Sequence, residues 1–423
     1  MTVIADDLTG AADCGTAFAL AGLPTFVSIG NAPAPDSAQI VSVDTDTRRL
    51  APDEAARRAG EAARDAYRRG TRTLYKKIDS TLRGHIAGEL AATFRAAAEL
   101  VGGEPPLVVF APAFPGTART LRDGRLRVAG VLLEETEVWR KSGMTGTAEP
   151  VAMLRLAGLK AESVPLEGVR SQLSAALARL LGRGVQVAVC DAEEEEDLRR
   201  IAEAGAAQRR PVIWVGSGGL ARHLPSSLRL RPRSTASPVQ RLTPGPVLAL
   251  VGSRSTVARD QARALGEEEG VATLILEPDV LLAGPRNAEW AAAIADLHRE
   301  LSSGRDVLLV TALGASIDLQ IGPALADALG RFAGEAAERI GGLIATGGDI
   351  ARAVLGALGA GGLHLLGEVE PGVPLGIADG RRPLPVVTKA GAFGTRATLV
   401  RGRDALKRLI NAEPGDPVRA GGS

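Results

Sequence analysis

The fold is decided by one stretch near the start of the sequence, Ile4-Ala5-Asp6-Asp7-Leu8-Thr9-Gly10-Ala11-Ala12-Asp13. A short apolar run gives way there to two adjacent carboxylates and a glycine turn, which is the pattern of a strand that leads into a helix. In α/β enzymes such a junction is a usual place for a base or a metal ligand. Asp6 and Asp7 are therefore candidates for catalytic or metal-binding residues.

The alternation of strand and helix continues along the whole chain. Short β-branched runs predict strands, and amphipathic stretches rich in Ala, Leu and Arg predict helices. In the first half we expect strands at 39–43, 73–78, 107–110, 185–189 and 212–215, and helices at 52–69, 86–100, 169–181 and 194–208. In the second half we expect strands at 247–251, 273–276, 307–311, 342–345 and 386–388, and helices at 257–268, 288–301, 323–340 and 351–358. This order predicts the α/β class, with mainly parallel sheets flanked by helices.

The chain is expected to divide into two α/β domains. Between Pro225 and Pro246 the periodicity fails, and proline and serine clusters follow one another, as in a linker or a domain edge. We place a first domain at residues 1–228, a linker at 229–245 and a second domain at 246–423.

Composition excludes several classes of function. The 423 residues are 45% apolar and 23% charged, which fits a globular chain of two ordinary domains. Fifty Lys and Arg residues against 49 Asp and Glu leave a formal charge of +1, and only 3% of residues are aromatic. A nucleic-acid-binding chain would carry a positive field and stacking platforms, so we expect no nucleic-acid partner.

Cysteine, histidine and hydropathy patterns indicate a cytoplasmic protein without a histidine-based metal site. Cys14 and Cys190 are far apart, and the four histidines share no ligand spacing. No apolar run approaches the ~20 residues of a membrane span, and no charged segment precedes an apolar one at the start. We therefore expect no membrane association and a cytoplasmic protein.

A second polar cluster follows the strand expected at 73–78. Its sequence is Lys76-Lys77-Ile78-Asp79-Ser80-Thr81-Leu82-Arg83-Gly84. Arginine and lysine can pair with the carboxylate of a small polyhydroxylated acid, while aspartate and serine can hydrogen-bond its hydroxyls. The alternative is a helix cap with solvated basic neighbours. We favour the binding site, because charges at the carboxyl end of a parallel strand point into the ligand crevice.

Three glycine-rich clusters in the second half predict a phosphate site. They are Gly252-Ser253-Arg254-Ser255-Thr256, Thr346-Gly347-Gly348-Asp349 and Lys389-Ala390-Gly391-Ala392-Phe393-Gly394. Glycine lets backbone N–H groups approach a phosphate, and a helix N-terminus adds a favourable dipole. Each cluster alone is also typical of an ordinary strand-to-helix turn. None contains the P-loop pattern or the dinucleotide fingerprint.

Together the motifs resemble those of the four-carbon acid sugar kinases over nearly the whole chain. In order along the chain, the motifs that carry the resemblance are Ile4–Ala11, Lys77–Gly84, Pro112–Pro115 followed by Arg119 and Gly124, Gly216–Leu220, Gly252–Ser255, Thr346–Asp349, Pro371–Pro374 and Lys389–Gly394. Eight short motifs in the family's order are a far more specific signal than any single one.

The resemblance implies an N-terminal domain that binds the sugar acid, a C-terminal domain that binds ATP, and an active site in the interdomain cleft. The γ-phosphoryl group would pass to the terminal hydroxyl of threonate, erythronate or 3-oxo-tetronate. The acid site implied by the resemblance consists of Asp6, Asp7, Lys77, Asp79, Ser80, Arg83 and Arg119. The nucleotide site implied by it consists of Ser253, Ser255, Thr346, Gly347, Gly348, Asp349, Gly391 and Gly394.

Phosphoryl transfer also needs neutralised phosphate charge, usually with Mg²⁺, and an acceptor for the hydroxyl proton. Asp6 or Asp7 is expected to act as that base or to bind the magnesium ion, since both lie at a strand end. The pattern leaves open a non-catalytic sensor that binds a nucleotide or a sugar acid. A dehydrogenase is disfavoured by the missing dinucleotide fingerprint. A homodimer is compatible with the sequence.

Overall fold

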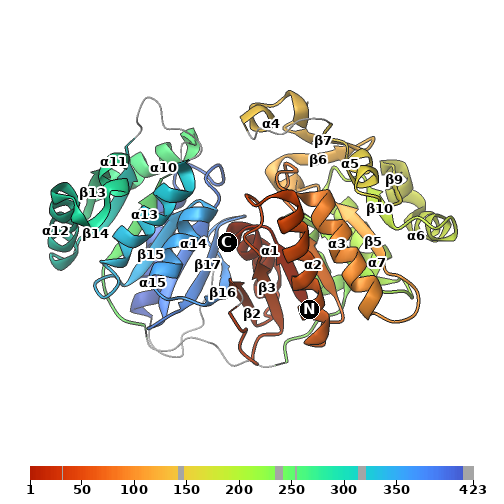
Figure 1. Cartoon of the computed structure of the whole chain (residues 1–423), viewed down its shortest axis with the longest axis horizontal. Helices are drawn as coiled ribbons and strands as arrows, with labels where there is room; N and C mark the ends of the chain where they lie inside the picture. Colours follow the sequence, from red (N-terminus) through yellow and green to blue (C-terminus); the bar gives the residue numbers. More distant parts are fainter. Residues whose placement is uncertain (31, 142–146, 234–241, 253–254, 313–320, 413–423) are drawn as a thin grey trace. The chain divides into compact units, whose positions relative to one another are not determined.

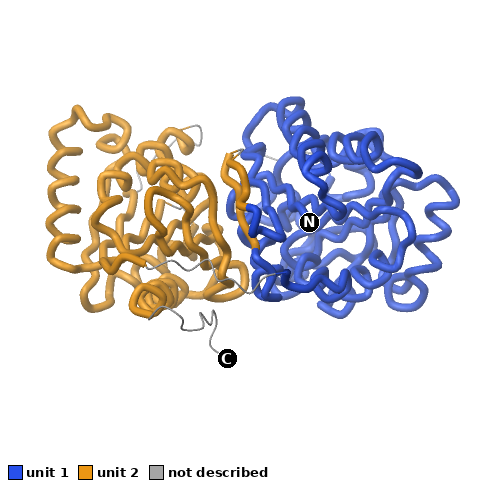
Figure 2. The backbone as a smooth tube through the Cα atoms, turned by 90° about the horizontal axis from the view of Figure 1, so that it is seen from below, with its two compact units in different colours: residues 1–24, 36–233 blue, residues 25–35, 234–423 orange. Residues whose placement is uncertain are grey.

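The computed structural model describes residues 1–30, 32–141, 147–233, 242–252, 255–312 and 321–412 (Figure 1). The chain forms two compact units, which Figure 2 shows in blue and orange. Unit 1 contains Met1–Pro24 and Asp36–Arg233, and unit 2 contains Thr25–Pro35 and Ser234–Ser423. In each unit, helices pack against the strands.

The main sheet of unit 1 is parallel throughout, with the strand order β3-β1-β4-β11-β5-β10-β9. Its strands are β1 (Thr2–Ala5), β3 (Ile40–Asp44), β4 (Leu74–Lys77), β5 (Leu107–Ala111), β9 (Ala161–Val164), β10 (Val187–Cys190) and β11 (Val212–Gly216). β1, β4, β5 and β10 are buried along their whole length. Burial on both faces is what parallel sheets require, which explains their near-continuous apolar sequences.

Helices cover both faces of this sheet (Figure 1). One apolar core joins Val3 and Trp214 to α1 (Leu8–Leu20), α6 (Leu166–Gly182) and α7 (Glu195–Ala206). The other joins Ile4 and Ile213 to α2 (Pro52–Arg68), α3 (Ile86–Leu100) and α5 (Pro150–Leu156). Neighbouring residues of one strand thus enter opposite cores. The remaining helices of the unit are short: η1 (Pro115–Thr117), η2 (Leu133–Glu135), α4 (Glu137–Lys141), α8 (Gly218–Ala221) and α9 (Leu224–Ser227).

Unit 1 also carries a small antiparallel sheet that the sequence did not predict. It consists of β6 (Arg119–Arg122), β7 (Arg125–Val128) and β8 (Val131–Leu132). The carboxylate of Asp191, which follows β10, accepts hydrogen bonds from the backbone of Asp123 and Gly124 at 2.7 and 3.1 Å. The turn between β6 and β7 is therefore fixed to the end of a strand of the main sheet.

The sheet of unit 2 has the strand order β13-β14-β12-β15-β18-β17-β16-β2. The parallel part consists of β12 (Val247–Val251), β13 (Val271–Leu276), β14 (Asp306–Thr311), β15 (Gly342–Thr346) and β18 (Leu384–Lys389). The antiparallel part consists of β2 (Thr25–Ile29), β16 (Gly362–Glu368) and β17 (Pro374–Asp379).

The helices of unit 2 are α10 (Thr256–Gly266), α11 (Pro278–Ala283), η3 (Gly284–Arg286), α12 (Ala288–Ser302), α13 (Gly322–Gly334), α14 (Gly348–Ala357) and α15 (Thr398–Asn411). α10 and α15 share one apolar core with β12, β15 and β18. Trp290 of α12 packs edge to face on Phe332 of α13, with the ring centroids 5.0 Å apart. Among the described residues, no helix is long and apolar enough to cross a membrane.

The predicted fold class is confirmed, since both units are α/β with mainly parallel sheets. One segment differs from the predicted domain boundaries. Residues 25–35, which the sequence analysis assigned to the first domain, belong to unit 2, because β2 pairs antiparallel with β16. Periodicity identifies an element but not the sheet that receives it, so this assignment could not be made from the sequence. The later change of unit, after Arg233, falls inside the expected linker.

Candidate functional site

The Asp6 and Asp7 carboxylates are held together by one arginine that the sequence analysis missed. Arg48 donates from Nε and Nη2 to Asp6 at 2.7 and 2.9 Å, and from Nη1 and Nη2 to Asp7 at 2.8 and 3.0 Å. The parallel pairing of β1 with β3 places Ala5 beside Asp44, so the loop that follows β3 begins next to Asp6. A charged run directly after a predicted strand was the sequence signal that could have identified Arg48.

Asp7 has a second role as the N-cap of α1. Its Oδ1 accepts from the backbone N–H of Gly10 at 2.9 Å, and its Oδ2 accepts from the Thr9 hydroxyl at 2.7 Å. This capping satisfies a donor that the first turn of a helix would otherwise leave unpaired. The side chain of Asp7 is 16% exposed, whereas that of Asp6 is 5% exposed. Asp7 is therefore the more accessible of the two carboxylates.

Charge balance keeps this cluster ionised. Burial by itself would raise the pKa of Asp6, but the Arg48 guanidinium, with help from Lys76 and Lys77, holds that pKa below its ordinary value. Burial would likewise lower the pKa of Arg48, but Asp6 and Asp7 hold it well above the ordinary range. Asp6 and Arg48 therefore stay charged at neutral pH.

Lys77 brings a further positive charge to the same place. β1 and β4 are parallel neighbours with Ile4 opposite Lys76, so the end of β4 lies beside Asp6. Lys77 is only 5% exposed. A side chain at Gly10 would approach its Nζ to 3.0 Å, which places the ammonium at the first turn of α1. No carboxylate of the described residues forms an ion pair with it.

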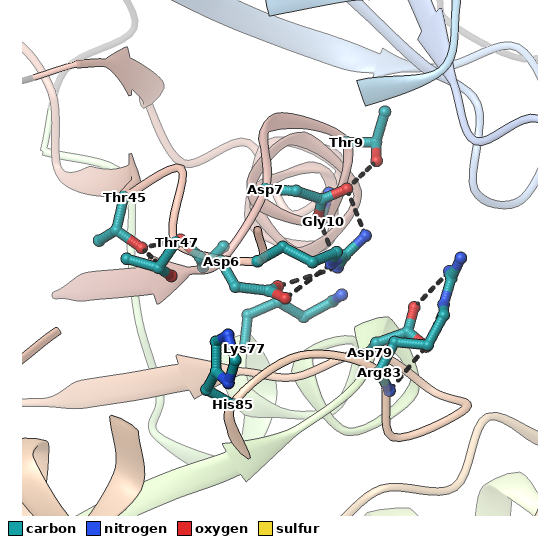
Figure 3. Close-up of polar contacts among 12 residues, drawn as sticks. Asp6, Asp7, Thr9, Gly10, Thr45, Thr47, Lys77, Asp79, Arg83 and His85 are labelled. Carbon is teal, nitrogen blue, oxygen red and sulfur yellow. Dashed lines mark hydrogen bonds and ion pairs between the residues drawn. The ribbon is translucent and has the colours of Figure 1, made fainter. Parts of the chain in front are cut away.

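Asp79 and Arg83 form a second charged pair after β4. Arg83 donates from Nε and Nη2 to the two oxygens of Asp79 at 2.9 and 2.7 Å, and Thr81 donates to the same carboxylate from its backbone N–H at 3.0 Å and from its hydroxyl. Burial alone would raise the pKa of Asp79, but Arg83, Arg48 and Thr81 hold it well below its usual range. Figure 3 shows this pair in the same region of unit 1 as Asp6, Asp7 and Lys77.

The other two predicted acid-site residues lie close to this pair. Arg119, at the start of β6, feels the charges of Asp79 and Arg83, and burial is the main cause that lowers its pKa. Its Nη1 donates to the carbonyl of Thr117. Ser80 is 7% exposed and adjoins Asp79 in the turn. All seven residues predicted for the acid site belong to unit 1.

In unit 2, three neighbouring parallel strands bring the glycine-rich clusters together. Val251 of β12 lies opposite Thr346 of β15, and Thr346 lies opposite Lys389 of β18. The clusters therefore begin at the same edge of the sheet, at the carboxyl ends of the strands, where open α/β sheets bind ligands. The backbone N–H of Gly347 donates to the carbonyl of Lys389 at 2.8 Å and ties two of the clusters together.

The turn after β15 leads directly into α14 through a glycine with a positive φ. Gly347 precedes α14 as its N-cap with φ of 101°, a conformation that favours glycine. Gly348 and Asp349 begin the helix, and Asp349 is exposed. The helix N-terminus thus leaves backbone N–H groups and a positive dipole at this edge.

The other predicted nucleotide residues flank this turn. Ser255 is the N-cap residue of α10. Gly391 and Gly394 lie in the turn after β18, where the Gln261 side chain donates to the carbonyls of Phe393 and Thr395 at 3.0 and 2.8 Å. Ser253 lies outside the described residues.

The carboxylates near the predicted sites were candidates to bind the expected magnesium ion. Among the described residues, no group of three or more His, Cys, Asp or Glu side chains could hold a metal ion. Mg²⁺ in phosphoryl-transfer enzymes is commonly bound by one or two carboxylates together with substrate phosphates and water. Single carboxylates such as Asp7 and Asp349 fit that mode of binding and do not fit a metal cage built from protein alone.

Two family models match this chain. The one described as a sugar-binding N-terminal domain matches residues 1–224, and the one described as a nucleotide-binding C-terminal domain matches residues 248–399. The polar cluster after β1 and β4 falls in the first match, and the glycine-rich clusters fall in the second.

Individual proteins resemble the chain along almost its full length. It is 43% identical to a D-threonate kinase of Cupriavidus necator over 94% of this chain and 95% of that protein. It is 30% identical to a D-erythronate kinase of Heliobacterium modesticaldum over 98% of each chain. A solved structure from Salmonella typhimurium LT2 superimposes with a TM-score of 0.77 at 24% identity, covering 95% of this chain and 98% of that one. This last likeness shows the fold alone.

Proposed function

The chain belongs to the four-carbon acid sugar kinase family, and we propose that it transfers the γ-phosphoryl group of ATP to the terminal hydroxyl of D-threonate. The family membership favours a kinase over the sensor and the dehydrogenase that the sequence left open. D-threonate is our first choice of acid, because the D-threonate kinase of Cupriavidus necator is 43% identical to this chain, against 30% for the D-erythronate kinase.

The observation that carries the proposal is the charge balance of the acid site. Four cations, Arg48, Lys77, Arg83 and Arg119, share the region with three carboxylates, Asp6, Asp7 and Asp79. Among these seven residues the cations exceed the carboxylates by one, which favours a monocarboxylate as the ligand. Arg48 and Arg83 are already engaged with aspartates, whereas Lys77 has no carboxylate partner among the described residues. Lys77 would therefore take the substrate's carboxylate.

Asp7 is the better candidate for the base that accepts the hydroxyl proton. It is more exposed than Asp6, which is nearly buried and has a lowered pKa. A base must reach the proton that it accepts, so accessibility favours Asp7. Asp6 would instead hold Arg48 in place. Asp79, with its depressed pKa, would accept hydrogen bonds from the substrate's hydroxyls alongside Ser80.

The amide-rich edge of unit 2 would bind the nucleotide. The N-termini of α10 and α14 and the turn that contains Gly391 and Gly394 would surround the phosphates. A magnesium ion carried by those phosphates would neutralise part of the charge that develops during transfer. Asp349 is the carboxylate of unit 2 that we propose as its protein ligand.

Turnover tests the proposal directly. Purified protein with ATP and Mg²⁺ should release ADP when D-threonate is added. The same assay should be run with L-threonate, D-erythronate and 3-oxo-tetronate for comparison. Phosphorus NMR of the product identifies the carbon that carries the phosphate. ADP release that is independent of every acid would contradict the proposal. Mass measurement in solution decides separately whether the protein is a homodimer.

A pair of lysine variants tests the role of Lys77. Lys77→Met should raise the KM for the acid by roughly 100-fold, because it removes a charge-assisted contact from a buried site. Lys160 is an exposed lysine of the same unit, so Lys160→Met is the matched control and should behave as the wild type. Equal kinetics for the two variants would remove Lys77 from the acid site.

A further inference from the structure

A buried ion pair near Asp6 includes Lys76, which helps to keep Asp6 ionised, and Glu89, which has no role in the chemistry described so far. The Nζ of Lys76 lies 2.7 Å from Oε2 of Glu89, and each side chain is 1% exposed. Lys76 also donates to the carbonyl of Lys77 at 3.2 Å. Burying such a pair gains little stability over well-packed apolar residues, so its presence calls for another explanation.

The second oxygen of Glu89 leads to the loop that carries Arg48. Thr47, which is fully buried, donates from its hydroxyl to Oε1 of Glu89 at 2.8 Å. The backbone N–H groups of Thr47 and Arg48 both donate to the carbonyl of Asp6, at 3.0 and 3.3 Å. Glu89 thus connects the end of β4, through Lys76, with the residue that precedes Arg48.

Glu89 lies in the first turn of α3, and the start of this helix fixes the loop at a second point. His85, the residue before α3, contacts the carbonyl of Leu50 through Nε2 at 2.7 Å. Figure 3 shows Thr45 and Thr47 beside Asp6, and His85 below Lys77. The start of α3 therefore holds the loop on both sides of Arg48, at Thr47 and at Leu50.

We propose that Thr47 and Glu89 are positioning residues that hold the Arg48 guanidinium between Asp6 and Asp7. Neither residue needs to touch the acid. Arg48 reaches both carboxylates with three nitrogens, and such a geometry tolerates little displacement of its backbone. The inference rests on the proposed function only in taking the acid site to be the place where Arg48 acts.

The test removes one hydroxyl and keeps the side-chain shape. Thr47→Val should raise the KM for D-threonate roughly tenfold and leave the KM for ATP within about twofold, because the displaced guanidinium affects only the acid site. Thr47→Ser keeps the hydroxyl and should restore the wild-type KM. If Thr47→Val does not fold, Thr47→Ala takes its place and should show the same rise in the KM for D-threonate and the same nearly unchanged KM for ATP.

Thr93 offers a matched control on the same helix. It is fully buried, and its hydroxyl has no hydrogen-bond partner among the described residues. Thr93→Val should leave both KM values unchanged. A Thr47→Val protein with a wild-type KM for the acid, or with equal rises in both KM values, would overturn the positioning role even if its Tm were lower.

The affinity for D-threonate, measured by calorimetry without ATP, separates this inference from the proposed function. A wild-type protein that binds the acid but does not phosphorylate it would contradict the kinase proposal. The Kd of Thr47→Val should then still be raised about tenfold. A Kd equal to that of the wild type would contradict the positioning role alone.

Discussion

Arg83 donates two hydrogen bonds, of 2.7 and 2.9 Å, to the carboxylate of Asp79 across a tight turn. Because the folded pKa of Asp79 lies well below its ordinary value, the carboxylate stabilises the fold above the unfolded pKa of about 3.9, and this contribution is lost as the pH falls further. The pair thus makes the acid site a source of pH-dependent stability.

Asp79→Asn should reveal this dependence. At pH 7 the free energy of unfolding of the variant should be lower than that of the wild type by roughly 1–3 kcal/mol. This loss is smaller than for a fully buried ion pair, because Arg83 is 42% exposed and solvent screens its charge. The difference from the wild type should shrink once the pH falls below about 3.9. Urea denaturation at pH 7 and near pH 3 measures both values. A difference that is the same at the two pH values would contradict the assignment.

Asp7→Asn separates catalysis from folding. Asparagine caps helices about as well as aspartate, so α1 should persist, while the variant loses its capacity to accept a proton. We expect kcat to fall by roughly 100-fold or more. The variant should still fold, with a lower Tm, because Arg48 loses one of its two carboxylate partners. Asp53→Asn, at an exposed residue in the first turn of α2, is the control and should keep full activity. If Asp7→Asn retains its kcat, the proton goes to another acceptor.

The parallel parts of the fold could be predicted from the sequence because their signals are local. A buried strand followed by an amphipathic helix repeats along the chain, and each predicted strand reappears in the structure, for example β4 and β15. The polar residues at their carboxyl ends then come together through strand order alone. This is why the pairing of β1 with β4 brings Asp6 and Lys77 into one region.

The parts that could not be predicted depend on long-range pairing. β16 and β17 form antiparallel neighbours that interrupt the βα alternation, and β2 joins them from far away in the sequence. Arg48 was missed for a related reason. It contacts Asp6 and Asp7, which directly follow the neighbouring strand β1, and the charged run around Arg48 does not by itself indicate those partners.

Gly394→Ala should weaken nucleotide binding. Gly394 has φ of 87°, and an added Cβ would meet Oε1 of Glu370 at 2.5 Å. That carboxylate also accepts from the Thr398 hydroxyl, so the turn after β18 would have to move. The KM for ATP should rise about tenfold, while the KM for the acid stays near its wild-type value.

Gly304 supplies the matched control for this change. It also has a positive φ, of 80°, but an added Cβ would have nothing within 4 Å. Gly304→Ala should therefore carry the backbone strain without the collision, and its KM for ATP should equal that of the wild type. If both variants raise the KM for ATP to the same extent, the effect reports general strain and not the nucleotide turn.

The stability of unit 2 should rise as the pH increases above about 8, because the buried Lys389 then loses its charge. Burial lowers the pKa of Lys389 to about 8, although Glu370 opposes the shift. Between about pH 8 and the unfolded value near 10.4, the unfolded chain binds more protons than the folded chain, so stability rises with pH. Lys389→Met removes the buried charge and should be more stable than the wild type below pH 8, by roughly 2–3 kcal/mol at most.

Calorimetric unfolding at pH 7 and near pH 10 should show this advantage shrinking at the higher pH, whereas the exposed-site control Lys160→Met should show no such trend. An advantage of Lys389→Met that persists unchanged near pH 10 would mean that better packing, and not removal of the charge, is its cause.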